Sequence, residues 1–148
     1  MRLPLTGGCL CGAVRYEIST QPVDAYVCHC RDCQKSTSSA FSIGIVVLDS
    51  ACAISGLDKT GLVFGGVAEN GGRRKSKRVC SGCGTWLFGE PRKFRGGAET
   101  VRIVRGGTFD DTSWIQPTRH IWTRSRQAWV VLPEGVACFE TQPPPAPT

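Results

Sequence analysis

Seven of the nine cysteines in this 148-residue chain fall into three tight clusters. In chain order the clusters are Cys9 and Cys11; Cys28, Cys30 and Cys33; and Cys80 and Cys83. Thiolate sulfur is a favoured ligand of zinc, and a Cys-x-x-Cys pair followed by glycine, as in "CSGCG", is typical of the turn of a zinc knuckle. The spacing of these cysteines therefore predicts metal binding.

The number of ligands separates a closed zinc site from an open one. A structural zinc has four protein ligands, whereas a catalytic zinc has three and keeps one position for water or substrate. The pairs in "CLC" and "CSGC" together make a complete set of four, which leaves Cys28, Cys30 and Cys33 as an open set of three. In the alternative pairing, "CSGC" shares a metal with two of the middle cysteines. That pairing leaves "CLC" and the remaining middle thiol without a complete ligand set. We favour the first pairing.

Composition is that of one globular domain. The apolar fraction is 41% and the charged fraction 20%, and no apolar run approaches the roughly 18 residues of a membrane helix. The opening "MRLPLTGGCLCG" lacks the continuous apolar segment of a secretory signal. We therefore expect a cytoplasmic protein that does not span a membrane. Reducing compartments disfavour structural disulfides, which favours metal ligation for the many cysteines.

The formal net charge is +6, and basic residues gather in "GGRRKSKR". Such a run suits an anionic substrate or nucleic acid, but a solvated basic strand or loop is the favoured interpretation. No aromatic residue is interleaved to stack on bases, so nucleic-acid binding is not expected. The basic residues of the run are Arg73, Arg74, Lys75, Lys77 and Arg78.

The 18 glycines and nine prolines interrupt the chain before a long helical period can develop. "AVRYEI" alternates Val14, Tyr16 and Ile18 on one face, as a half-buried strand does. "AFSIGIVVL" predicts a strand with Phe41, Ile43, Ile45 and Val47 on one face, and "ACAISG" predicts a neighbouring strand after the turn at Asp49 and Ser50. Further strands are expected in "RRKSKRVC", "TWLFG", "TVRIVRG", "RHIWTRS" and "AWVVLP".

The pattern as a whole predicts an all-β domain. The only helical candidates are a turn after Cys33 and one near Asp110 to Trp114. The tail "QPPPAPT" is proline-rich and is expected to be extended or disordered.

Several other side chains have a plain structural interpretation. Cys52 and Cys138 lie in apolar stretches and are expected to be small buried hydrophobes. His29 adjoins two cysteines and would have to reach around its own backbone to be a ligand, so we expect it to line a pocket or to be exposed. His120 is expected in the core or at an interface. The tryptophans expected in the core are Trp86, Trp114, Trp122 and Trp129.

Five segments resemble the glutathione-dependent formaldehyde-activating enzyme (GFA) family, also found as the domain of centromere protein V. They are "GGCLCGAVRYEI", "CHCRDCQKSTSSAFS", "RVCSGCGTWLF", "RGGTFDD" and "PTRHIWTRSRQAWV". The resemblance implies a β-tent fold, in which small antiparallel sheets meet around zinc. It also implies a GFA-type domain over residues 1–141 and a proline-rich tail over residues 142–148. Many members carry a glycine shortly after the third cysteine of the middle cluster, where this chain has Ser38.

The resemblance implies two zinc ions per chain, the second being the more labile. The structural zinc would be held by Cys9, Cys11, Cys80 and Cys83, and the catalytic zinc by Cys28, Cys30 and Cys33. The family's named activity is a carbon-sulfur lyase reaction run in the bond-forming direction, which joins formaldehyde and glutathione. The implied partners are a small-molecule thiol and an aldehyde, and a homo-oligomer is compatible with the sequence.

Near the open set, Arg31 and Lys35 are candidates to pair with substrate carboxylates. Tyr26, His29 and His120 are candidates to line the pocket. Two other functions remain open for the chain. One is a non-enzymatic binding module stapled by zinc, and the other is a thiol redox sensor built on "CHCRDC".

Overall fold

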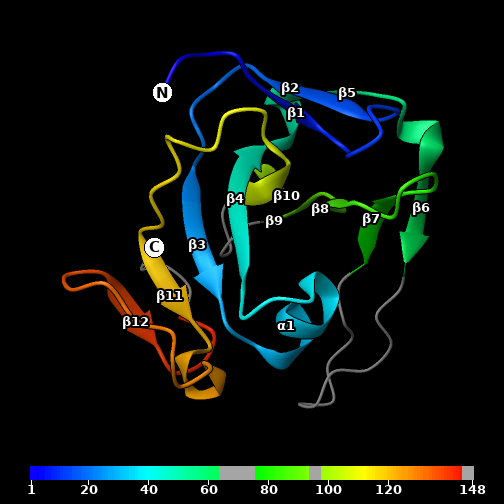
Figure 1. Cartoon of the computed structure of the whole chain (residues 1–148). Coiled ribbons are helices and arrows are strands. Elements are labelled where there is room, and N and C mark those ends of the chain that lie inside the picture. Colours follow the sequence, from blue (N-terminus) through cyan, green and yellow to red (C-terminus); the bar gives the residue numbers. More distant parts are fainter. Residues whose placement is uncertain (64–75, 94–97, 145–148) are drawn as a thin grey trace.

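The computed structural model describes residues 1–63, 76–93 and 98–144. Over these residues the chain forms twelve short strands, one α-helix and four 3-10 helices (Figure 1). The 3-10 helices are Asp49–Ala51, Leu57–Lys59, Gly106–Thr108 and Thr123–Ser125. The prediction of a mainly β fold is therefore confirmed.

A small antiparallel sheet contains the strands β1 (Leu5–Gly8), β2 (Arg15–Ile18) and β5 (Cys52–Ser55), in the order β1-β2-β5. Val14, Tyr16 and Ile18 are all buried, as their alternation predicts. The expectation that "ACAISG" neighbours the preceding strand is wrong. The 3-10 turn at Asp49–Ala51 leads the chain into the other sheet, where Cys52 pairs with Ile18.

The remaining strands form a larger sheet in the order β12-β11-β3-β4-β10-β8-β7-β6, with β9 paired to β10. Most neighbours are antiparallel, but β11 runs parallel to both β3 and β12. The bounds are β3 (Asp24–Cys28), β4 (Ser42–Leu48), β6 (Thr60–Val63), β7 (Lys77–Cys80), β8 (Trp86–Gly89), β9 (Arg92–Lys93), β10 (Thr100–Arg105), β11 (Arg119–Ile121) and β12 (Ala137–Phe139).

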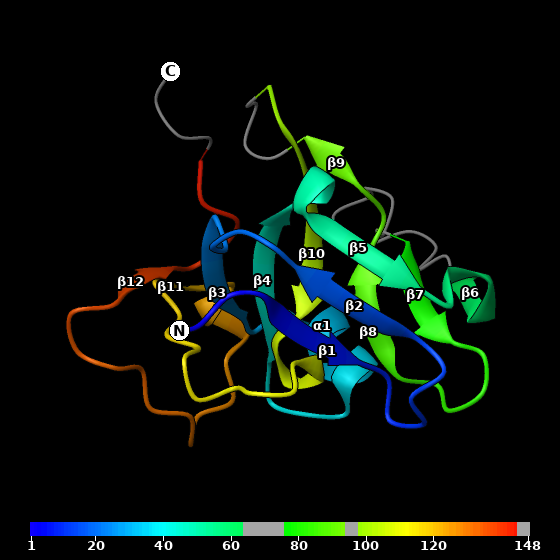
Figure 2. The same ribbon diagram turned by 90° about the horizontal axis from the view of Figure 1, so that it is seen from above.

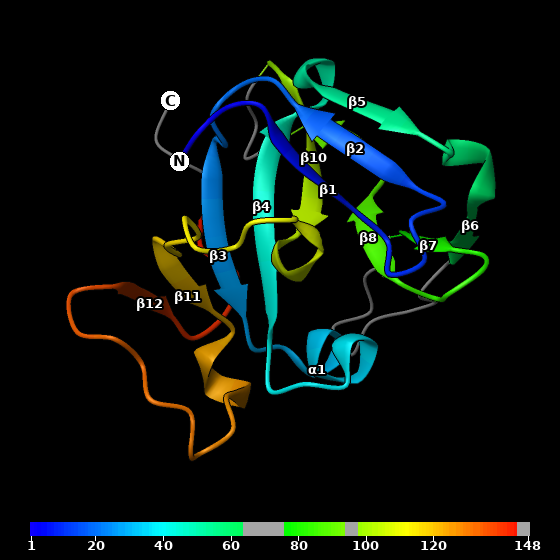
Figure 3. The ribbon, with the colours of Figure 1, turned by 45° about the horizontal axis from the view of Figure 1, so that its top comes forward.

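The main core lies between the two sheets. Figures 2 and 3 show β1, β2 and β5 crossing the face of the larger sheet over β4, β10 and β8. Tyr16 and Ile18 of the small sheet belong to the same buried cluster as Ile45, Phe88 and Val104 of the larger one. Burial of these apolar side chains is the main force that holds the sheets together.

The helix α1 (Arg31–Thr37) begins before Cys33, so the predicted turn after that residue is a helix that contains it. Cys30 caps the first turn, because the backbone N–H of Cys33 donates to its sulfur at 3.4 Å. The helix ends at Ser38, whose φ of 50° is in the left-handed region that favours glycine. Ser38 thus adopts a conformation that a glycine would adopt without strain.

Two predicted elements are absent from the part of the chain that the structure describes. The stretch from Asp110 to Trp114 is not a helix, because Asp111 accepts the N–H of Ser113 at 2.9 Å and closes a turn instead. The "AWVVLP" segment is not a strand. Its Val131 is 86% exposed and Trp129 is 72% exposed, so the apolar letters there do not mark a buried face.

The other burial predictions have mixed outcomes. Trp114 and Cys52 pack partly against the main core, whereas Cys138 is exposed and Trp129 is outside the core. Trp86 and Trp122 are half-buried. In the basic run, Arg73, Arg74 and Lys75 lie outside the described residues, and Lys77 and Arg78 belong to β7. The last four residues of the predicted tail lie outside them too. None of the described helices is both long and apolar enough to cross a membrane.

We expect Ile45→Ala to lower the free energy of unfolding by roughly 2–5 kcal/mol, because Ile45 is fully buried and the change leaves a cavity. Urea denaturation of the zinc-loaded protein, followed by circular dichroism, measures the effect. The control is Val131→Ala, which shortens an exposed aliphatic side chain and should change the free energy by less than about 0.5 kcal/mol. Equal effects of the two substitutions would contradict the placement of Ile45 in the core.

Candidate functional site

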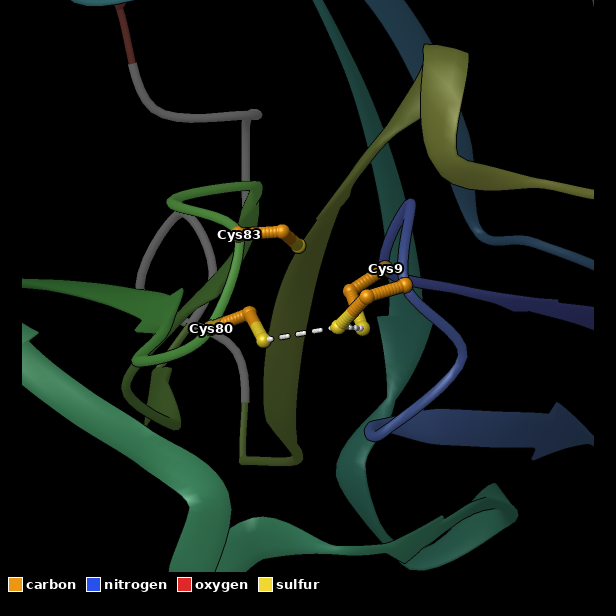
Figure 4. Close-up of side chains that lie close together, drawn as sticks. Cys9, Cys80 and Cys83 are labelled. Atoms are coloured by element: carbon orange, nitrogen blue, oxygen red, sulfur yellow. Dashed lines mark hydrogen bonds between the residues drawn. The ribbon is translucent and has the colours of Figure 1, made fainter.

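The first cysteine cluster joins the two sheets. Cys9 and Cys11 lie in the turn after β1, Cys80 ends β7, and Cys83 lies in the turn before β8. Figure 4 shows the side chains of Cys9, Cys80 and Cys83 pointing toward one another from these two turns. The loop before β2 is thereby brought against the β7–β8 hairpin.

The geometry of this cluster fits one metal ion. The sulfurs of Cys9 and Cys11 are 3.5 Å apart, those of Cys11 and Cys80 are 3.7 Å apart, and all four lie within 4.8 Å of one another. Four sulfur ligands in a tetrahedron at about 2.3 Å from a zinc ion lie roughly 3.8 Å apart. The four cysteines could therefore hold a zinc ion with little movement.

Backbone and hydroxyl donors support these sulfurs. The N–H of Val14 donates to Cys9 Sγ at 3.3 Å. The Thr85 hydroxyl lies 3.2 Å from Cys83 Sγ and accepts the N–H of Leu10 at 3.2 Å. Hydrogen bonds from the hydroxyl and backbone of Thr85, and then from the backbone of Cys11, lower the pKa of Cys83 to about 5. A metal-ligating thiol must be deprotonated, so this environment favours ligation.

Thr85 is a supporting residue that sequence reasoning missed. A hydroxyl residue two positions after the second cysteine of the knuckle was the available signal. Gly84, between them, has a φ of 73°, and its N–H donates to the carbonyl of Cys80 at 2.9 Å. The "CSGCG" turn thus closes as the glycine in that position predicts.

The second cluster lies where β3 passes into α1. Cys28 ends β3, Cys30 is the helix N-cap, and Cys33 lies in the first turn of the helix. Their sulfurs all lie within 4.8 Å of one another, close enough to bind one metal ion. No other cysteine, histidine or carboxylate among the described residues joins this group, which therefore offers three ligands.

The three thiols shift one another's pKa values. Hydrogen bonds from Cys28 and then Cys30 hold the pKa of Cys33 well below its ordinary value, and Ser42 and the charge of Arg105 add to this. Hydrogen bonds with Cys30 and then with Cys33, followed by burial, raise the pKa of the Cys28 thiol. The cluster is therefore poised to exchange protons for a cation.

A cavity of about 420 Å³ lies beside this cluster. Ser42 links the two, since it lines the cavity and pairs with Cys28 in the sheet. The volume is in the range of pockets that bind small molecules. The lining residues are Ser36, Thr37, Ser39, Phe41, Ser42, Ile43, Trp86, Arg105, Gly106, Gly107 and Thr108.

The sequence-based candidates for this pocket lie elsewhere. Tyr26, His29 and His120 do not line the cavity, and neither do Arg31 and Lys35, which are exposed. Arg31 instead donates to Gln34 Oε1 at 3.1 Å. The cation in the cavity wall is Arg105, which the sequence analysis did not single out.

His29 is fully buried, so the expectation that it lines a pocket or is exposed is wrong. Its Nε2 lies 2.9 Å from His120 Nδ1, and the two rings stack with centroids 5.2 Å apart. His29 Nδ1 has no hydrogen-bond partner among the described residues. His120 is buried, as predicted for a core histidine. The parallel pairing of β11 with β3 brings this pair together.

Burial makes both imidazoles neutral at pH 7. Burial, and then the electrostatic interactions with His120 and Arg126, lower the pKa of His29 to about 4, and burial also lowers the pKa of His120. A folded-state pKa below the ordinary value means that the folded form loses stability as the pH falls from about 6.5 toward 4. The two histidines form an uncharged, buried pair next to the cluster.

Gln34 fixes the backbone around His29. Its Nε2 donates to the carbonyl of His29 at 2.7 Å and to the carbonyl of Ser125 at 2.9 Å. The buried amide thus ties α1 to the residues just before the helix and to the segment after β11. Sequence reasoning missed this residue, because a glutamine in a helix carries no mark of such a role.

The chain was compared with known proteins. A model of the family described as glutathione-dependent formaldehyde-activating enzyme matches residues 4–125, which is most of the chain. The chain therefore belongs to this family. Among curated proteins no significant match is found. The fold is similar to that of a Rhodobacter sphaeroides protein in a crystal structure, with a TM-score of 0.51 and 18% sequence identity over 90% of this chain and 98% of that chain.

We expect His120→Leu to lower the free energy of unfolding by about 1–3 kcal/mol, because it leaves both nitrogens of the buried His29 imidazole without a partner. Urea denaturation of zinc-loaded protein provides the measurement. His29→Leu is the second arm of a double-mutant cycle. The double variant should lose less stability than the sum of the single variants, by about 1 kcal/mol. Additive losses would mean that the two rings do not interact.

Proposed function

We propose that this member of the glutathione-dependent formaldehyde-activating enzyme family is a zinc-dependent carbon-sulfur lyase that forms or cleaves an adduct between a thiol and an aldehyde. The observation that carries the proposal is the difference between the two cysteine clusters. One offers a complete set of four ligands between the sheets, and the other offers three ligands beside a cavity of about 420 Å³.

The ligand sets assign the two metals in this proposal. Cys9, Cys11, Cys80 and Cys83 would hold a structural zinc, because four protein sulfurs fill a tetrahedral site. Cys28, Cys30 and Cys33 would hold the catalytic zinc as ligands, not as nucleophiles. When bound there, zinc supplies a Lewis acid that can favour the thiolate form of a substrate or polarise an aldehyde oxygen.

The reaction needs no oxidant or reductant. In the forming direction the substrate sulfur attacks the aldehyde carbon, a carbon-sulfur bond forms, and the proton of the thiol ends on the former carbonyl oxygen. The reverse direction breaks that bond and returns the proton to sulfur. The protein therefore has to place two small molecules and let one proton move between them.

Residues of this chain can perform the placement. Cys30 and Cys33 are held by the first turn of α1, and Cys28 by its pairing with Ser42 in the sheet. The ring of Phe41 lines the cavity and packs edge-on against His29, which gives the site an apolar wall that limits water. Ser42 offers a hydroxyl next to Cys33 at the boundary between cluster and cavity.

The two clusters should respond differently to loss of a cysteine. We expect Cys80→Ala to bind one zinc fewer and to unfold or aggregate, because structural zinc contributes folding free energy directly. Cys30→Ala should also bind one zinc fewer but remain folded, since its cluster lies at the edge of the core. Metal analysis and thermal unfolding measure both effects, and Cys138→Ala, which alters an exposed cysteine, is the control.

A Cys80→Ala protein of normal thermal stability would contradict the structural assignment. Equal zinc content in the parent and in Cys28, Cys30 and Cys33 variants would contradict the open site.

Turnover is tested by adding catalytic amounts of zinc-loaded protein to formaldehyde and glutathione at equilibrium with their adduct. Exchange spectroscopy by NMR measures the interconversion rate. We expect acceleration by the parent and by Cys138→Ala, and a loss of at least roughly 100-fold in Cys30→Ala, which lacks a ligand of the catalytic zinc. If the folded, zinc-loaded parent does not accelerate exchange with glutathione or other small thiols, the lyase proposal fails and a zinc-stapled binding module becomes the better description.

A further inference from the structure

We propose that Arg105, assisted by Lys77, binds a carboxylate in the cavity beside Cys33 and thereby selects small thiols whose nearest charged group is a carboxylate. This inference rests on the proposed function for the identity of the substrate, but the carboxylate site itself is a property of the cavity. The argument starts from the state of the Arg105 side chain.

Arg105 differs from four other arginines of the strands. Arg78, Arg102 and Arg119 pair with Glu90, Asp49 and Asp24, and Arg15 pairs with Asp110. No carboxylate among the described residues pairs with Arg105. A half-buried guanidinium has five N–H donors and is normally satisfied by an acidic or carbonyl acceptor. Arg105 is therefore short of acceptors.

Its recorded contacts leave most of these donors unused. Nη1 reaches Ser42 Oγ at 3.4 Å, a long bond, and Nε is buried with no acceptor among the described residues. The guanidinium carbon lies 4.3 Å from the centre of the Trp86 ring, which holds the side chain in place. The indole Nε1 of Trp86 is likewise without an acceptor. This wall has donors in excess.

Lys77 brings a second cation to the same indole. Its Nζ lies 4.8 Å from the centre of the Trp86 ring and donates to Ser36 Oγ, and Ser36 lines the cavity. Two cations on one aromatic ring repel each other unless an anion lies between or beside them. The lining residues contain no aspartate or glutamate that could supply it. A bound anion fits this charge distribution.

The position of Ser42 relates the proposed anion site to the cluster that would bind the sulfur of the substrate. Its hydroxyl accepts from Arg105 at 3.4 Å, and its backbone pairs with Cys28 of the three-thiol cluster. One small side chain thus separates the guanidinium from the three-thiol cluster. A molecule with a carboxylate at Arg105 and a sulfur at the cluster spans this distance only if the two groups are close together, as in a mercaptocarboxylic acid. An ammonium group in the same place would be repelled by the Arg105 guanidinium.

The binding test uses ligands that cannot react. 3-(Methylthio)propionate and its neutral amide, 3-(methylthio)propanamide, are titrated into the zinc-loaded full-length protein, and calorimetry and tryptophan fluorescence measure affinity. We expect the acid to bind at least roughly 10-fold more tightly than the amide in the parent protein. Arg105→Met should reduce this ratio to about 1, Arg105→Lys should keep part of it, and Lys77→Met should reduce it roughly 3-fold.

The matched control is Arg124→Met. Arg124 is an exposed arginine that also lies over an indole, 5.1 Å from the centre of the Trp122 ring, but it does not line the cavity. Its substitution should leave the preference for the acid unchanged. Circular dichroism and zinc content show whether each variant is folded, and Lys77→Met carries the test if Arg105→Met does not fold.

Equal affinities for acid and amide in the parent, no saturable binding of either, or a preference that survives loss of the Arg105 charge would overturn the proposal. The outcome is separable from that of the lyase proposal. Acid preference without adduct turnover keeps the site and removes the activity. Turnover that treats 3-mercaptopropionate, 2-mercaptoethanol and cysteamine alike keeps the activity and removes the site.

Discussion

The meeting of four thiols between two sheets is the contact on which the rest of this structure depends. A sheet of three four-residue strands needs a hydrophobic face packed against another layer for its stability, and here the larger sheet is that layer. Two of the thiols, Cys9 and Cys80, are buried members of the main core, so the cluster and the apolar packing form one unit. A metal ion there would neutralise thiolates that otherwise repel one another inside that core.

The second cluster obeys a different constraint. Its three cysteines lie within six residues of one another, and their arrangement is set locally by the end of β3 and the first turn of α1. The fold needs only to supply what stands behind and in front of them. Behind are the neutral His29–His120 pair and the amide of Gln34, which hold the backbone. In front are Ser42 and the cavity, where a ligand has access.

Sequence patterns predicted the parts of this molecule that depend on local chemistry. The cysteine spacing grouped the same residues that the structure brings together, and the alternation of Val14, Tyr16 and Ile18 marked a buried face. Features that depend on distant contacts were missed. Cys52 pairs with Ile18 and not with β4, His29 is buried because β11 lies parallel to β3, and Trp129 is exposed because no strand forms there. No local pattern encodes those neighbours, nor the lack of an acid beside Arg105 among the residues that the structure describes.

The β7–β8 hairpin joins the first cysteine cluster to the wall of the cavity. Cys83 lies in its turn, and Trp86, three residues later, begins β8 and carries the stacked Arg105. Only Gly84 and Thr85 separate these two residues, and the N–H of Cys80 donates to the carbonyl of Thr85 at 2.9 Å, which closes the turn next to Trp86. Cys83 and the indole under Arg105 therefore belong to one hairpin. By thermodynamic reciprocity, whatever factor metal occupancy contributes to affinity at the indole, occupancy at the indole returns to the metal.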